Sequence, residues 1–313
     1  MLNQAKRGSA LITALFIMTL VAITATAIST RLQLDIYRVR LTQNSDRLYL
    51  ASQAVTFWAM DRLADPKQDL INLDQNAKIL DFPKKLKSIY PQVITQGSLY
   101  DLQAKFNLNN LSDRAFFPAF LGLLEQVLPH IDPQERKSIL DATINWINGA
   151  TGKNDAHDEW LDRYLKQRPI YLPGYQFMQH VSEFRTVLGI NAQRYAVLLP
   201  YLTALPEATG INLNTAPLAL LRSLGDGVSK HDAEEIIKLR NKKEIKNLSE
   251  LGPLIEKLNI PKNEITLESN YFLATAITSI DDMTLVHYAV LKRSKNKQGK
   301  LSISIMSEGI NTN

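Results

Sequence analysis

The chain has 313 residues and no cysteine, and its 36 basic and 31 acidic residues give a net charge of +5. The lack of cysteine excludes disulfides, thiolate metal sites and cysteine nucleophiles. The charge is too small to indicate a nucleic-acid partner, and the length predicts two or more domains beyond an N-terminal helical stalk.

The first predicted element is a membrane segment. Residues 9–30 contain no charged residue, proline or glycine, and a helix of this length crosses a hydrocarbon core of about 30 Å. Lys6 and Arg7 precede it and predict a cytoplasmic N-terminus with the body outside, although arginines beyond the segment, beginning with Arg31, oppose that orientation. A secretory signal peptide cut near residue 27 and a plain signal anchor are two interpretations of this segment.

The helical pattern continues past the membrane. No glycine or proline lies between Gly8 and Pro66, so this stretch predicts one helix of roughly 80 Å at about 1.5 Å per residue. Its second half carries an apolar stripe at three- and four-residue steps, which packs on this chain's own domain, on neighbouring subunits, or on both at different heights. The stripe consists of Leu34, Tyr37, Leu41, Asn44, Leu48, Ala51, Val55 and Trp58.

A third interpretation rests on a resemblance. A short basic leader ending in glycine, an uncharged apolar helix and an amphipathic extension resemble a type IV pilin or pseudopilin. The resemblance implies cleavage by a prepilin peptidase after Gly8, with Ser9 as the mature N-terminus. The family usually has glutamate at the fifth mature position, where this chain has Thr13. A missing glutamate is typical of the K-type minor pseudopilin of type II secretion, and it favours a subunit that need not dock beneath another.

After the long N-terminal helix, the sequence predicts a helical region followed by strands. We expect loops with a helix around 81–90, a strand at 98–106, helices at 115–128, 133–147, 160–165, 181–188 and 192–199, and strands at 271–278, 285–293 and 300–306. The segments YDLQAKFNLNNL, ATINWINGATGKNDAHDEW, SEFRTVLGI and INLNTA resemble the K-type family in order and spacing. A strand near residue 100 and three after 270 predict one sheet interrupted by an insertion.

The predicted fold class is therefore α+β. A pilin-like long N-terminal helix packs on a small antiparallel sheet, and a large inserted all-α domain contains a helix-hairpin-helix-like segment. The predicted boundaries are a leader at 1–8, a transmembrane half at 9–30, a stalk with the first strand at 31–110, an inserted domain at 111–267 (bundle 111–210, hairpin part 211–267) and final strands at 268–313.

A polar loop is the candidate metal site. Asp155, Asp158 and Asp162 supply hard oxygen donors, which suit calcium. The resembled family binds calcium with an aspartate-rich loop, but here Asn148 and His157 replace the expected acids, which lowers the ligand charge. A solvated acidic loop is the alternative.

A second hypothesis concerns residues 211–258, which resemble a helix-hairpin-helix segment of membrane-tethered DNA receptors. The hairpin would be Gly225 to Gly227, where backbone amides contact phosphates. Asp226 and the acidic start of the following helix oppose a polyanion. We therefore expect a helical core here and no nucleic-acid partner.

No zinc-protease motif, nucleophile elbow or complete P-loop is present in the sequence, so no active site is predicted. The resemblance implies an assembly subunit of the inner membrane with a periplasmic body, which caps and primes a pseudopilus. Its implied partners are the I-type and J-type minor pseudopilins, the major pseudopilin, the inner-membrane secretion platform and the prepilin peptidase. The stalk residues Leu41, Leu48, Val55 and Trp58 are the expected interface with the helices of partner subunits.

Overall fold

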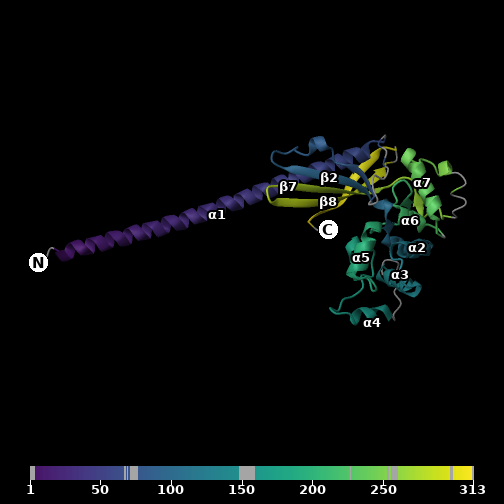
Figure 1. The fold of residues 1–313 in the computed structure, drawn as a ribbon, viewed down its shortest axis with the longest axis horizontal. Coiled ribbons are helices and arrows are strands. Elements are labelled where there is room, and N and C mark those ends of the chain that lie inside the picture. The colour runs from purple at the N-terminus through teal and green to yellow at the C-terminus, as the bar shows by residue number, and fades with distance from the viewer. Residues whose placement is uncertain are drawn as a thin grey trace.

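The computed structural model describes residues 4–66, 68, 70, 77–147, 159–225, 227–251, 254, 260–296 and 299–311, without the side chains of 4–9 and 159. Helix α1 runs without interruption from Gln4–Ala64, 61 residues. It ends just before Pro66, which has no N–H to continue the helix. The predicted single long helix is confirmed (Figure 1).

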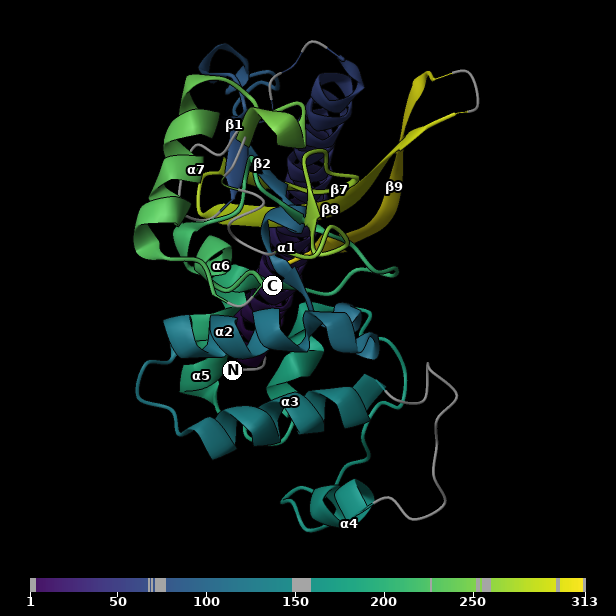
Figure 2. The ribbon, with the colours of Figure 1, turned by 90° about the vertical axis from the view of Figure 1, so that its right-hand side faces the viewer.

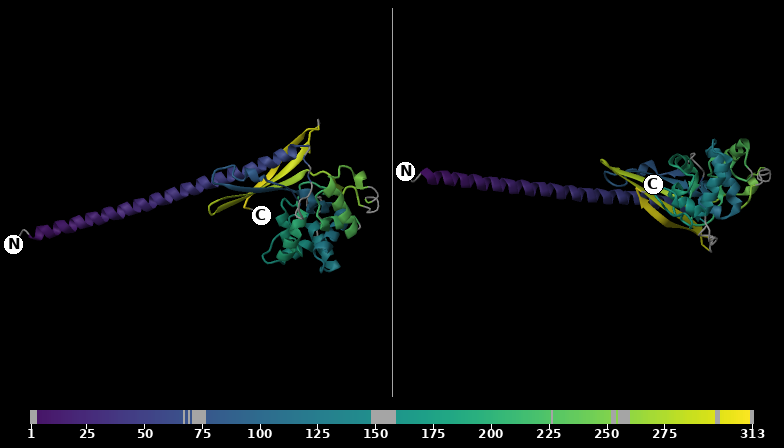
Figure 3. Two further views of the ribbon diagram at one scale, coloured as in Figure 1. Left: turned by 45° about the horizontal axis from the view of Figure 1, so that its top comes forward. Right: turned by 90° about the horizontal axis from the view of Figure 1, so that it is seen from below.

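The second half of α1 lies on an antiparallel sheet. The strands are β1 (Lys78–Asp81), β2 (Ile94–Asp101), β7 (Tyr271–Ile280), β8 (Met283–Lys295) and β9 (Leu301–Ile310), in the order β1-β2-β7-β8-β9. Strand β2 pairs with β7 along its whole length, which places Tyr100 opposite Leu273. The strand before the insertion and the strands after it therefore form one sheet, as predicted, and α1 runs along them at a shallow angle (Figure 3).

Two local predictions are wrong. The segment 81–90 is not a helix, because Asp81 ends strand β1 and only a short 3-10 turn, η1 (Lys84–Leu86), follows Pro83. The strand predicted at 98–106 begins earlier, at Ile94, and ends at Asp101. It ends there because the Asp101 carboxylate accepts a hydrogen bond from the Gln103 N–H (2.8 Å) and turns the chain into η2 (Leu102–Ala104).

The inserted residues 106–267, here called the head, lie beyond the end of the sheet (Figures 1 and 2). Helix α3 has the predicted bounds, and the predicted helix 181–188 is a 3-10 helix, η6. Buried residues from all parts of the head form one apolar core. The described elements are β3 (Phe106–Asn107), η3 (Leu108–Ser112), η4 (Arg114–Phe116), α2 (Phe117–Val127), α3 (Pro133–Ile147), α4 (Glu159–Leu165), η6 (Val181–Thr186), α5 (Ala192–Leu198), η7 (Leu199–Tyr201), β4 (Leu202–Thr203), β5 (Ile211–Asn212), α6 (Leu218–Arg222), α7 (Lys230–Lys242), η8 (Leu248–Leu251) and β6 (Ile265–Thr266).

Two units of the head, one from β3 to β4 (residues 106–203) and one from β5 to β6 (residues 211–266), repeat one local structure. Strand β3 pairs in parallel with β4, and β5 pairs in parallel with β6. In the first unit, the buried Asn109 donates to the Met178 carbonyl and accepts from the Met178 N–H, both at 2.9 Å. In the second unit, Asn214 makes the same pair of 2.9 Å bonds with Ile245. The two units of the head therefore share a strand pairing and an asparagine contact, although the first contains four α-helices among the described residues and the second two.

The repetition extends to the turns that follow Met178 and Ile245. Glu183 accepts from the N–H groups of Gln179 and His180, and Glu250 accepts from those of Lys246 and Asn247. This duplication was not predicted from the sequence. Its signal was the recurrence of Asn-Leu-Asn at 107–109 and 212–214, and of Ser-Glu at 182–183 and 249–250.

Candidate membrane anchor and assembly surface

The first half of α1 has the properties of a membrane span. Among the described residues it is the one helix long and apolar enough to cross a membrane, and its most apolar window is not buried by the rest of the chain. Its threonine hydroxyls bond to helix carbonyls, for example Thr13 to Ala10 (3.0 Å) and Thr26 to Ala22 (2.8 Å). Because lipid offers no partner for a polar group, these bonds suit the hydrocarbon core.

The processing residues lie at the beginning of this helix. Gly8 and Ser9 are within the helical bounds of α1, and their side chains are outside the described ones. Cleavage between them stays a prediction. At Thr13 the helix presents a hydroxyl and no carboxylate, so the span carries no charge from Ala10 to Thr30.

The sheet covers only the second part of the apolar stripe predicted from the sequence. Leu48 and Val55 are fully buried against this chain's own sheet, where Val55 packs with Phe82 and Ala276. The Trp58 ring meets the Phe82 ring edge-on at 5.5 Å. For this part of the stripe, the first interpretation, packing on the chain's own domain, describes the structure.

The predicted interface with partner helices is wrong at Leu48 and Val55. The sheet already covers Leu48 and Val55, so a partner helix has no access to them in the folded chain. Leu41 is half-buried, whereas Leu34 and Tyr37 above the membrane segment are exposed. We name the residues from Leu41 to Trp58 in this stripe the inner stripe.

A second apolar stripe lies on the opposite side of α1. Its side chains are between 50% and 63% exposed, and their spacing places them on one helix face. We name it the outer stripe: Leu32, Ile36, Val39, Leu50 and Phe57. The outer stripe was not predicted from the sequence, because the polar residues Gln43 and Asp46 interrupt the apolar repeat on this face.

Arginines border the outer stripe on both sides. At about 100° per residue, Arg31 and Arg38 fall on one side of it, and Arg40 and Arg47 fall on the other. An exposed apolar seam with charged borders is the pattern of a helix that packs against another amphipathic helix. The outer stripe is therefore the candidate assembly surface.

A buried carboxylate joins the sheet to the head. Asp101 ends β2 and accepts hydrogen bonds from the Ser269 hydroxyl (2.7 Å), the Asn212 amide (3.0 Å) and the Thr215 hydroxyl. Burial raises the pKa of the Asp101 carboxyl above its usual value, and these hydrogen bonds oppose the rise. Since Asn212 and Thr215 belong to the second unit of the head, the contact holds that unit at the end of the sheet.

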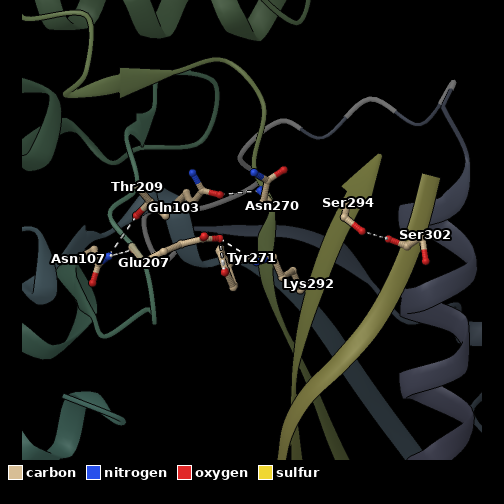
Figure 4. A network of polar contacts seen from close by, with 9 residues as sticks. All are labelled: Gln103, Asn107, Glu207, Thr209, Asn270, Tyr271, Lys292, Ser294 and Ser302. Carbon is tan, nitrogen blue, oxygen red and sulfur yellow. Dashed lines mark hydrogen bonds and ion pairs between the residues drawn. The ribbon is translucent and has the colours of Figure 1, made fainter. Parts of the chain in front are cut away.

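A second, more exposed contact lies beside it (Figure 4). Glu207 of the head accepts hydrogen bonds from the Lys292 ammonium (2.8 Å) and the Tyr271 hydroxyl, both on the sheet. The Lys292 ammonium also lies 5.1 Å from the centre of the Tyr271 ring. These bonds lower the pKa of Glu207, chiefly through Lys292. The two contacts therefore hold the head against the end of the sheet.

The glycine hairpin of the second unit is occupied by this chain's own carboxylate. The Gly225 N–H donates to the buried Glu264 carboxylate (3.1 Å). Arg240 is buried, donates to the carbonyls of Leu213 (2.8 Å) and Ala216 (2.7 Å), and has its pKa lowered by burial to about 10. Neither group is available to a phosphate, so the hairpin gives the DNA-binding alternative no support.

The predicted calcium ligands lie mostly outside the described residues. Asp155 and Asp158 are not described, and Asp162 is exposed on α4. Among the described residues no group of three metal-ligating side chains occurs. The calcium prediction therefore stays a prediction.

A membrane-length helix that continues onto a small antiparallel sheet and carries a helical head at its far end defines a pilin-like assembly subunit. Two profiles described as type II secretion system (T2SS), protein K, match residues 104–207 and 211–268, which correspond to the two units of the head. The chain belongs to the family of type II secretion system protein K, the K-type minor pseudopilins.

Individual relatives agree with this assignment. The type II secretion system protein K of Aeromonas hydrophila is 29% identical over 93% of this chain and 94% of its own length. That of Klebsiella pneumoniae is 31% identical over 68% of each chain. In fold, the chain is similar to a crystal structure from the GspK-GspI-GspJ complex of the enterotoxigenic Escherichia coli type 2 secretion system, with a TM-score of 0.69 and 19% identity over 88% of this chain and 100% of that one.

Proposed function

We propose that this minor pseudopilin caps the tip of a pseudopilus and primes its assembly, anchored in the inner membrane by α1 with its head in the periplasm. The observation that carries the proposal is the outer stripe, whose exposed apolar residues lie next to the membrane half of α1 and again at the level of the sheet. Exposed apolar surface of this extent is typical of interaction sites. Partner helices that covered it would remove five large side chains from water.

The partners we propose are the I-type and J-type minor pseudopilins. A structural relative of this chain was crystallised with GspI and GspJ, and a family that shares a long N-terminal helix can pack its members helix against helix. Arg38 pairs with Asp35 of this chain (3.5 Å), and the other arginines that border the outer stripe favour partner helices with carboxylates at the facing positions. We extend the proposal to contacts with the major pseudopilin and the inner-membrane secretion platform.

The position at the tip is supported by both ends of the chain. At the membrane end, Thr13 offers no carboxylate to the terminal amine of a subunit above. At the other end, the head lies beyond the end of the sheet (Figure 1), and its contacts with Asp101 and Lys292 hold it there. Subunits can therefore pack below the head, along α1, and none is needed above.

Maturation is part of the proposal. Prepilin peptidase should cut after Gly8, so Gly8→Val should block removal of the leader, whereas the matched Gly8→Ala variant keeps a small residue beside the cut. Mass spectrometry of the membrane-extracted chain should find a mature N-terminus at Ser9. Cleavage near residue 27 would identify a secretory signal peptide and contradict a membrane-anchored stalk.

Complex formation tests the function directly. The full chain, purified in detergent with its I-type and J-type partners, should elute as a heteromeric complex that contains all three. Each protein alone and each pair serve as controls. If the chain stayed free with both partners at high micromolar concentration, the tip-complex assignment would be wrong.

A further inference from the structure

The two edges of the sheet are built differently. The edge strand β1 has four residues, and two of them, Lys78 and Asp81, are charged and form an ion pair (3.4 Å). The opposite edge strand, β9, has ten residues and none of them is buried. Natural proteins usually protect a sheet edge with short strands, charges or proline, so β1 is a protected edge and β9 is an open one.

Apart from an irregularity of register between Ile305 and Ser307, strand β9 has few protective features. It contains no proline, lysine or arginine. Its one charged residue, Glu308, lies near the C-terminal end and faces His287, with 3.8 Å between the Glu308 carboxylate and the His287 Nε2. Residues Leu301 to Ser307 are therefore uncharged, with Leu301 and Ile303 half-buried and the other five exposed along the edge.

The hydrogen-bond pattern of β8 shows which groups of β9 point outward. The Arg293 N–H donates to the Asn270 carbonyl (2.7 Å), so the backbone groups of Arg293 face away from β9. Arg293 is opposite Ile303. In an antiparallel ladder such a residue directs its own N–H and C=O away from the pair, and by alternation Leu301 and Ile305 do the same. No hydrogen bond among the described residues engages these outward groups.

We propose that the β9 edge, at Leu301, Ile303 and Ile305, binds an extended strand of a neighbouring subunit in the pseudopilus tip and so lengthens the sheet. Strand addition of this kind uses main-chain hydrogen bonds for affinity and alternate side chains for specificity. On the side of α1 the incoming strand meets Ile303 and Ile305, so it carries apolar residues there. On the other side it meets Ser302 and Ser304, so it carries small polar ones.

A second copy of this chain does not fit the edge. Two β9 strands paired antiparallel would point their α1 helices in opposite directions, because α1 runs along the strands (Figure 3). Two anchors in one membrane exclude that arrangement. A parallel pair of identical strands cannot be two-fold symmetric, because residues opposite each other in a parallel ladder use their backbone groups differently. Both symmetric pairs are thus excluded, and the proposed tip position leaves one copy of this chain in each assembly. We therefore assign the occupant to a different chain, an I-type or J-type partner, as in the complex of the structural relative.

The inference rests on the proposed function, and the experiment separates the two. Ile305→Pro removes one outward N–H and leaves the bonds to β8 in place, whereas Ile305→Val keeps the N–H and serves as the control. Ile305→Lys tests the same edge through its side chain, because it places a charge there and keeps the N–H. Each variant of the full chain in detergent is titrated against the purified I-type and J-type partners, and its thermal midpoint is compared with that of the unmodified chain.

We expect Ile305→Pro and Ile305→Lys to weaken the complex about tenfold, with Ile305→Val and all thermal midpoints near the parent. The chain has no cysteine, so Ser304→Cys introduces a single thiol, which is labelled with a photoreactive maleimide. On illumination this label should cross-link to a partner and not to a second copy. Unchanged affinity in both Ile305→Pro and Ile305→Lys, while Phe57→Glu on the outer stripe weakens the complex, would overturn the β9 site alone. If Phe57→Glu had no effect on affinity either, both the β9 site and the proposed function would fail. Cross-linking between two copies of this chain would refute the assigned occupant.

Discussion

The inner and outer stripes of α1 have similar residue types and similar spacing, but different surroundings. Val55 on the inner stripe is fully buried against the sheet, whereas Phe57, two residues later, is 63% exposed. The difference arises from the sheet, where Gly97 on β2 lets the helix approach: a Cβ at this position would overlap Val55 Cγ1 and lie 3.0 Å from the Thr275 carbonyl oxygen. One helix therefore serves both as a core element and as an assembly surface.

The largest effect is expected when a charge is placed on the inner stripe, which the sheet covers. Val55→Asp should destabilise the chain by about 4 kcal/mol, because it buries an unpaired carboxylate in an apolar contact. Chemical unfolding followed by tryptophan fluorescence in detergent measures the change, since Trp58 packs nearby. Phe57→Asp is the matched control and should keep the unfolding midpoint of the parent. Equal midpoints for both variants would show that the sheet does not cover Val55.

A smaller effect is expected at the glycine that allows the close approach. Gly97→Ala should destabilise the folded chain by about 2 kcal/mol, because the added methyl overlaps Val55 and presses on the backbone of β7. In the double variant with Val55→Ala, part of that loss should be recovered, since contacting residues are coupled. Strict additivity of the two changes in unfolding free energy would argue against this contact.

The outer stripe should respond in binding and not in stability. Phe57→Glu should leave the unfolding free energy within about 0.5 kcal/mol of the parent. The dissociation constant of the complex with I-type and J-type partners should rise about tenfold, or about 1.4 kcal/mol. Phe57→Leu keeps an apolar side chain and should bind nearly as well. A stability loss without a binding loss would reverse the roles assigned to the two stripes.

The smallest effect on stability is expected at the exposed contact between the head and the sheet, the ion pair of Glu207 with Lys292. The pKa of Glu207 is lowered in the folded chain, so its contribution is present above the unfolded pKa and is lost as pH falls through the folded pKa. Because the side chain is half exposed, we expect about 0.5 kcal/mol. Thermal midpoints measured from neutral to acid pH should show this loss in the parent. Glu207→Gln should flatten that part of the profile, and an unchanged profile would exclude a role for the ion pair.

Several features of this protein follow from the sequence alone. An uninterrupted run without glycine or proline from residue 9 to 65 permits one long helix, and the uncharged half of that run suits a membrane. A proline at the first turn predicts where α3 begins, and alternating apolar residues after 270 predict three strands. These are local properties, because helix breaking, capping and alternation each depend on residues close together in the chain.

The tertiary structure decided which surfaces are covered. Both stripes of α1 are apolar in the sequence, and only the position of the sheet shows that Leu48 and Val55 are buried and that Leu50 and Phe57 are exposed. Likewise, the Gly225 amide has the local pattern of a phosphate hairpin, but Glu264, 39 residues away, occupies it. Coverage and occupancy depend on contacts between distant residues, and residue type and spacing along the chain do not specify them.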